Sequence, residues 1–194
     1  IPMAGCVLQR RTYEAPQLRF APMAISSTRP HSLPDLRRVL VIGGGGCEHA
    51  LSGALQRHDA IETVWITPGN AGSDQQTLAI AETDSAALIA HCQTHSVDLV
   101  VVGPEAPLAA GVADALRQAG IAVFGPGAEG AQLEASKAWA KQLMQEAGVP
   151  TAGHWAVTSE VDALAVLAEV GRPLVVKADG LAAGKGVTVA DTIE

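Results

Sequence analysis

From residue 38 onward, short uninterrupted apolar runs alternate with longer segments in which apolar residues recur every three or four positions. The runs predict strands buried on both faces, at residues 39–42, 63–66, 97–102 and 121–124. The longer segments predict helices at residues 49–57, 85–95 and 108–118. Strands and helices that alternate at this spacing form βαβ units, so the pattern predicts a Rossmann-like parallel sheet with helices on both faces.

The pattern changes after residue 128. It then predicts two helices, at residues 132–147 and 160–170, and two strands, at residues 174–177 and 187–190. The glycine-containing loop between these strands predicts a hairpin rather than a crossover. We therefore expect three regions: a leader at 1–37, an α/β domain at 38–128, and the beginning of an α+β domain at 129–194.

The leader carries five arginines against two acidic residues, and it shows no lasting periodicity. It predicts a disordered segment, translated sequence before a start at Met23, or an organelle transit peptide, for example plastidic. We expect it to contribute nothing to a folded core. The chain begins with Ile1 and ends at Glu194, just after a strand-like run, so we interpret it as a fragment.

Composition narrows the class of protein. Hydrophobic residues make up 48% and charged residues 17%, which excludes a disordered chain. The net charge of −7 and the 3% aromatic content argue against a nucleic-acid binder. No apolar run is long enough to predict a membrane span. Three cysteines without a CxxC pair suit a reducing cytosol rather than a disulfide or zinc framework.

Candidate chemistry begins at the glycine run between the first strand and the first helix. Backbone N–H groups there can reach a phosphate at the helix N-terminus, although a tight turn without a ligand is the alternative. The third glycine of a dinucleotide-binding motif would fall on Glu48, so a nicotinamide cofactor is disfavoured. The candidate substrate-binding residues in this segment are Gly43, Gly45, Gly46, Cys47, Glu48 and His49.

Two polar residues follow other strands at the same edge of the predicted sheet. Asn70 lies in Pro68-Gly69-Asn70-Ala71-Gly72, and Glu105 lies in Gly103-Pro104-Glu105-Ala106-Pro107. Each could be an ordinary turn or helix start. Ligands bind at the carboxyl ends of open parallel sheets, so the shared edge favours a site.

A second candidate site surrounds Lys177, which ends an apolar strand and precedes a glycine-rich loop that contains Lys185. Ammonium and N–H groups suit a polyphosphate, whereas a surface hairpin is the alternative. The loop is not a Walker motif, because Gly186 follows Lys185. We expect His91 and His95 to lie on the solvent side of their helix, and Cys92 in the core.

The order of these motifs resembles the phosphoribosylamine–glycine ligases, also called glycinamide ribonucleotide synthetases, from Arg38 to the C-terminus. Single motifs are weakly specific, but their joint order is highly specific. Besides those above, the resemblance uses Phe124-Gly125-Pro126, Leu133-Glu134-Ala135-Ser136-Lys137 and Lys177-Ala178-Asp179-Gly180-Leu181-Ala182-Ala183-Gly184-Lys185-Gly186-Val187.

The resemblance implies an ATP-grasp ligase of purine synthesis that joins 5-phosphoribosylamine and glycine, using ATP and Mg²⁺ (or Mn²⁺), through a glycyl phosphate. The substrate phosphate would face Gly45 and Gly46, and the ribose would face Glu105. ATP would contact Lys137, Lys177, Asp179, Gly180, Gly184, Lys185 and Gly186, with Lys177 and Lys185 stabilising phosphate charge.

Two departures from the family pattern matter. The family usually has Arg where this chain has Cys47, and the metal-binding acids are expected beyond residue 194. The fragment is therefore not expected to be active alone. The alternatives are another ATP-grasp carboxylate–amine ligase or carboxylase, and a non-catalytic nucleotide-binding module. We expect a cytoplasmic location unless the leader directs the protein to an organelle.

Overall fold

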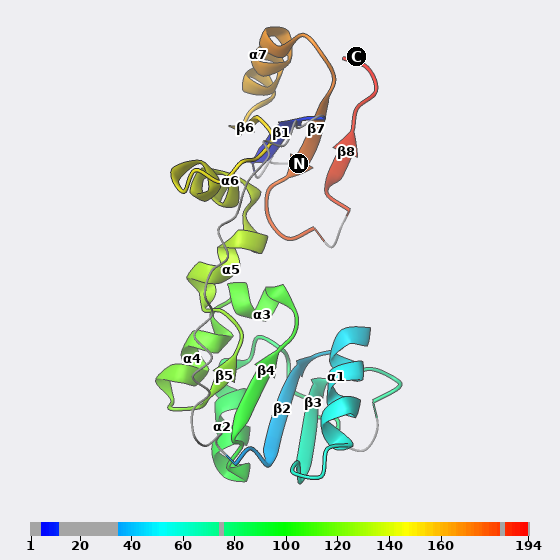
Figure 1. Ribbon diagram of the computed structural model, residues 1–194, viewed down its shortest axis with the longest axis vertical. Helices are drawn as coiled ribbons and strands as arrows, with labels where there is room; N and C mark the ends of the chain where they lie inside the picture. Colours follow the sequence, from blue (N-terminus) through cyan, green and yellow to red (C-terminus); the bar gives the residue numbers. More distant parts are fainter. Residues whose placement is uncertain (1–4, 12–34, 74–75, 183–184, 194) are drawn as a thin grey trace, which may run out of the picture. The chain divides into compact units, whose positions relative to one another are not determined.

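A computed structural model describes residues 5–11, 35–73, 76–182 and 185–193 (Figure 1). The chain divides into two compact units, which are described separately. The first combines Ile1–Ser26 with Gln132–Glu194, and the second is Ser27–Ala131.

The second unit contains the predicted parallel sheet, which confirms the fold class. Its strand order is β3-β2-β4-β5 and every pairing is parallel. The strands are β2 (Arg38–Gly43), β3 (Thr63–Pro68), β4 (Leu99–Val102) and β5 (Val123–Phe124). The helices are α1 (Gly46–Gln56), α2 (Ser85–His95), α3 (Glu105–Ala109) and α4 (Val112–Gln118).

Alternate residues of β2 face opposite sides of this sheet, and both sides are covered. Val39 and Val41 pack with β3 residues and with Leu55 of α1. Leu40 and Ile42 pack on the other side with α2 and α4 residues, including Leu116. Residues 39–42 of β2 are all buried, which matches the uninterrupted apolar run at these positions.

The predicted helix at 108–118 is two helices, α3 and α4. Gly111 separates them with a φ of +83°, a left-handed conformation that glycine adopts without steric cost. The chain therefore turns at a residue that we had placed inside a helix.

The first unit is built on an antiparallel sheet with the order β6-β1-β7-β8. Its strands are β1 (Cys6–Arg10), β6 (His154–Val157), β7 (Leu174–Ala178) and β8 (Val187–Val189). The β7–β8 pairing is the predicted hairpin. The remaining helices are α5 (Ala128–Ala135), α6 (Lys137–Glu146) and α7 (Glu160–Val170).

Polar residues and a glycine determine where α6 begins and where α7 begins and ends. Ser159 caps α7 by accepting the Asp162 N–H at 3.1 Å, and Gly171 ends the helix in the left-handed conformation. The predicted helix at 132–147 is interrupted, because Ser136 leaves helical geometry and caps α6 by accepting the Trp139 N–H.

The expectation that residues 1–37 contribute nothing to a core is wrong for Cys6–Arg10. These residues form β1, which lies between β6 and β7 and pairs with both. Leu8 packs with Val157, Leu174 and residues of α7, and Val7 is buried on the opposite face. β1 (CVLQR) and β6 (HWAV) mix polar with apolar residues, so neither shows the uninterrupted apolar run from which the other strands were predicted. Residues 12–34 lie outside the described part of the chain.

Candidate functional site

The loops that leave the parallel sheet converge at its carboxyl edge. From β2 the chain passes to β3 on one side and then to β4 on the other, so the order of connection reverses between β2 and β4. Ligands bind in the crevice at such a switch point. Gly43 ends β2, whereas Asn70 and Glu105 come shortly after β3 and β4, so the structure brings these three predicted positions to one edge.

The Glu48 side chain lies at this edge of the sheet and is buried. Its carboxylate accepts the Gly45 N–H at 2.8 Å, closing the N-terminus of α1. A Cβ atom at Gly43 or at Gly103 would collide with the Glu48 side chain. The glycines therefore leave room for Glu48, and its role in binding substrate stays a prediction.

Asn70 holds two of the loops together. Its side-chain N–H groups donate to the carbonyl oxygens of Gly44 at 3.1 Å and Gly45 at 3.4 Å. Its Oδ1 accepts the Gly72 N–H at 2.8 Å. The side chain thereby fixes the glycine loop relative to the loop after β3.

The three loop segments at this edge offer backbone N–H groups but no basic side chains. Gly46 and Cys47 begin α1 and are exposed, and Glu105 is exposed at the beginning of α3. The segments 43–49, 68–72 and 103–107 contain no Lys or Arg. A phosphate bound here would therefore depend on the N–H groups and dipole of α1.

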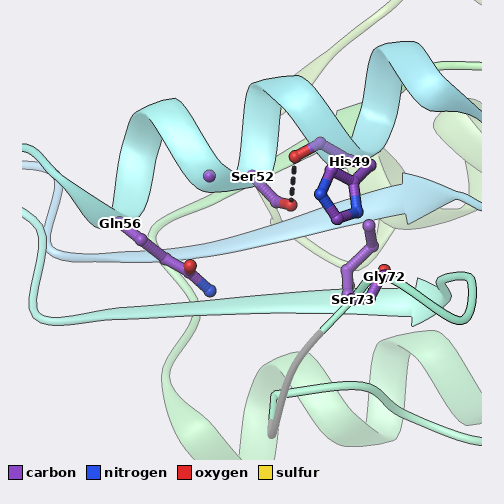
Figure 2. Close-up of a pocket in the computed structure, with 7 residues that line it drawn as sticks. His49, Ser52, Gln56, Gly72 and Ser73 are labelled. Carbon is purple, nitrogen blue, oxygen red and sulfur yellow. Dashed lines mark hydrogen bonds between the residues drawn. The ribbon is translucent and has the colours of Figure 1, made fainter.

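A small polar pocket lies beside α1 (Figure 2). His49, Ser52 and Gln56 point from one face of the helix toward Gly72 and Ser73, around a volume of about 70 Å³. Ser52 donates to the His49 carbonyl oxygen at 3.0 Å. A Cβ atom at Gly72 would approach His49 Cε1 to 2.9 Å, so glycine gives the imidazole its space. Ser52 and Gln56 were missed, although their spacing from His49 places them on its helix face.

In the first unit, Asp179 and Lys137 meet at the N-terminus of α6. The Asp179 carboxylate accepts the N–H groups of Lys137 at 2.6 Å and Ala138 at 3.2 Å, and the Ser136 hydroxyl at 3.1 Å. Lys137 Nζ donates to the Gly180 carbonyl oxygen at 2.8 Å. These bonds join α6 to the loop after β7. Sequence reasoning missed Ser136 as a partner of Asp179.

Lys177 lies close to Lys137 and to a further lysine. A cavity of about 170 Å³ is lined by Lys137, Lys177 and Lys141, together with residues of β1 and α6. Burial and, secondarily, the charge of Lys177 lower the pKa of Lys141. Lys141 was missed, and the available signal was its spacing of one helical turn from Lys137.

The remaining predicted nucleotide-binding residues belong to the loop between β7 and β8. Lys185 is exposed, and its N–H donates to the Ala182 carbonyl oxygen at 2.8 Å. Gly186 accepts the Ala178 N–H at 2.7 Å through its carbonyl oxygen. Gly184 lies outside the described residues. Lys185 does not line the cavity that contains the other lysines.

His91 differs from the solvent-side position that we expected. Its ring stacks on His95 with centroids 4.3 Å apart and meets Trp65 edge-on at 5.1 Å. Its Nε2 atom is buried, without a hydrogen-bond partner in the described part of the chain. Burial, followed by the charge of His95, lowers the pKa of His91. Cys92 is buried as expected, and burial raises its pKa to about 11.

Two features are absent from the residues that the structure describes. No group of three or more His, Cys, Asp or Glu is arranged to hold a metal ion. No helix among these residues has the length and apolar character to cross a membrane.

Comparison with family models divides the chain into two matches. The model for "Phosphoribosylglycinamide synthetase, N domain" matches residues 37–134. The model for "Phosphoribosylglycinamide synthetase, ATP-grasp (A) domain" matches residues 135–194.

Named relatives agree with these matches. The chain is 51% identical over 161 residues to phosphoribosylamine–glycine ligase of Escherichia coli O6:H1, which covers 81% of this chain and 38% of that protein. It is 52% identical over 159 residues to the Streptomyces coelicolor protein of the same name, with 81% and 38% covered. The chain therefore spans little more than a third of the length of these relatives.

Similar folds occur in solved structures. The structure described as glycinamide-RNase-transformylase T from Mycobacterium tuberculosis has a TM-score of 0.57 and 24% identity, covering 77% of this chain and 45% of that one. A biotin carboxylase–βγ-ATP complex from Campylobacter jejuni has a TM-score of 0.56 and 18% identity, covering 78% and 38%. At these identities the likeness is one of fold.

Proposed function

Because this chain belongs to the phosphoribosylglycinamide synthetase family, we propose that it is part of an enzyme that ligates glycine to 5-phosphoribosylamine at the expense of ATP. The two consecutive family matches, which together run from residue 37 to residue 194, carry this proposal. The high identity to phosphoribosylamine–glycine ligases supports it.

The second unit would bind 5-phosphoribosylamine at the carboxyl edge of its parallel sheet. The N–H groups at Gly45 and Gly46 would hold the phosphate, with Cys47 and His49 beside it. Glu105 would accept hydrogen bonds from ribose hydroxyls. Support comes from the shared edge, from the exposure of Gly46, Cys47 and Glu105, and from the bonds by which Asn70 fixes the glycine loop.

The first unit would bind ATP. Lys137 and Lys177 would neutralise phosphate charge, while the loop that contains Asp179, Gly180, Lys185 and Gly186 would cover the phosphates. A carboxylate oxygen of glycine would attack the γ-phosphorus and release ADP, and the phosphoribosylamine nitrogen would then attack the glycyl carbon and release phosphate. The residues of this chain contribute positioning and charge stabilisation rather than a covalent intermediate.

Mg²⁺ is part of the family expectation, but the described residues provide no group that fits it. We therefore assign the metal no ligand and no step. The expected cytoplasmic or organellar location also stays a prediction.

The test is product formation by the protein in its natural length. With ATP, glycine and 5-phosphoribosylamine supplied, we expect glycinamide ribonucleotide together with equal amounts of ADP and phosphate. Bicarbonate or other amino acids in place of glycine should give no product. ATP cleavage that requires a different acid would establish another ATP-grasp ligase or carboxylase, and nucleotide binding without any cleavage would establish a binding module.

A further inference from the structure

The cavity between the antiparallel sheet and α6 in the first unit gathers positive charge. Its three charged lining residues are Lys137, Lys141 and Lys177, and each is half-buried. The other lining residues are apolar except Gln9, whose amide oxygen is buried without a hydrogen-bond partner among the described residues. None of the described residues that line the cavity carries a carboxylate.

The three ammonium groups have few acceptors within the protein. Lys137 Nζ donates to the Gly180 carbonyl oxygen. Lys141 Nζ donates to Thr151 Oγ1 and, at 3.4 Å, to the Ala152 carbonyl oxygen. Lys177 has no ion pair or side-chain hydrogen bond within the described ranges. An ammonium group carries three donors, so the cavity holds unused donors as well as uncompensated charge.

Nearby anionic groups do not supply the missing charge. The Asp179 carboxylate contacts this end of α6, where it already accepts the N–H groups of Lys137 and Ala138 and the Ser136 hydroxyl. Three like charges in a partly desolvated cavity are unfavourable unless an anion joins them. The lowered pKa of Lys141 reflects this strain, because burial and the charge of Lys177 are its causes.

We propose that Lys141 binds the polyphosphate of the nucleotide together with Lys137 and Lys177. This inference rests on the proposed function, because ATP is the polyphosphate that the first unit would bind. Lys141 follows Lys137 by one turn and therefore lies on the same face of α6. Its bonds to Thr151 and Ala152 orient the ammonium group, and its remaining donor capacity faces the cavity.

The competing role for Lys141 is purely structural. In that role its bonds to Thr151 and Ala152 would tie α6 to the segment before β6, and no ligand would be involved. Three variants separate the two roles. Lys141→Met removes the charge, Lys141→Arg keeps it, and Thr151→Val removes only the hydrogen bond to Thr151. Arg172 provides a matched control, because it is an exposed cation of the same unit that lines no described cavity.

The experiment is calorimetric titration of tripolyphosphate and of ATP into the protein in its natural length. We expect Lys141→Met to weaken tripolyphosphate binding by about tenfold or more, the loss typical of one charge-assisted contact. Lys141→Arg should retain most of the affinity. Arg172→Met and Thr151→Val should stay within about twofold of the wild type, as surface and neutral changes usually do.

Three results would overturn the inference: no tripolyphosphate binding by the wild-type chain, unchanged binding by Lys141→Met, or equal losses in Lys141→Met and Thr151→Val. The last result would assign Lys141 the structural role. Failure of the proposed function has a different signature. It would appear as Lys141-dependent tripolyphosphate binding in a protein that, at its natural length, forms no glycinamide ribonucleotide.

Discussion

Replacing Leu8 by alanine tests whether β1 is an integral strand of the first unit. Leu8 is 2% exposed and packs with Val157 and Leu174, both of which are also buried. Truncating a leucine in such a core costs about 2–5 kcal/mol, as lost transfer free energy plus a cavity term. Small domains have total stabilities of about 5–15 kcal/mol, so the loss should populate the unfolded first unit measurably.

Hydrogen exchange followed by mass spectrometry can assign the effect to one unit. Peptides that cover β6 and β7 should lose protection in Leu8→Ala, because both strands pair with β1. Peptides that cover β2 and β4 belong to the second unit and should be unchanged. Urea denaturation followed by Trp155 fluorescence, in a background with Trp65 and Trp139 replaced by Phe, should give the corresponding decrease in the free energy of unfolding.

Arg11→Ala is the matched control, because Arg11 follows the same strand but is exposed. Its ion pair with Asp191 spans 3.2 Å at the surface, and such pairs contribute about 0–1 kcal/mol. Unchanged protection of β6 and β7 in Leu8→Ala would refute the placement of β1. It would also restore the expectation from sequence that residues 1–37 can be deleted without loss of stability.

Three further predictions concern single side chains. Lys177→Ala in the protein of natural length should abolish ligation while the melting temperature stays unchanged; normal turnover would remove Lys177 from the site. Cys47→Arg should lower the KM for 5-phosphoribosylamine by about tenfold, because Arg adds a charge-assisted contact at the beginning of α1. The KM for ATP should not change, and unchanged kinetics for both substrates would show that position 47 points away from the phosphate. The folded-state pKa of His91 is lowered, so the unfolded chain binds its proton first, and stability should fall as the pH drops through about 6.5. Urea midpoints measured between about pH 7.5 and about pH 5.5 should change less in His91→Phe, whereas an identical pH dependence would contradict the assignment.

The long periodic segments gave reliable predictions, because both faces of the parallel sheet are buried and α2 and α7 carry their own caps. The breaks at Gly111 and Ser136 were missed, since a periodic apolar pattern continues across both residues. β1 and β6 were missed because both contain polar residues and show no uninterrupted apolar run. Strand pairing between residues far apart in the chain cannot be read from local sequence.

The candidate sites were also predictable from the sequence only in part. Motif positions after the parallel strands, such as Asn70 and Glu105, could be placed at the same edge of the sheet from the order of elements. The inward carboxylate of Glu48 and the convergence of Lys141 with Lys177 could not be predicted. Both depend on the register of packing between a helix and a sheet, which the sequence of either element does not specify.

The pairing of β1 with β7 has a consequence for how the chain folds during synthesis. Val7 pairs with Lys177, so the first unit cannot close its sheet until the residues of β7 have left the ribosome. The second unit is continuous from Ser27 to Ala131 and can form while the strands of the first unit are still being made. Closing a long loop costs conformational entropy, and a loop that already contains a folded body has fewer free residues to restrain. Until then, β1 is a strand without its partners, open to chaperones or to a neighbouring polypeptide.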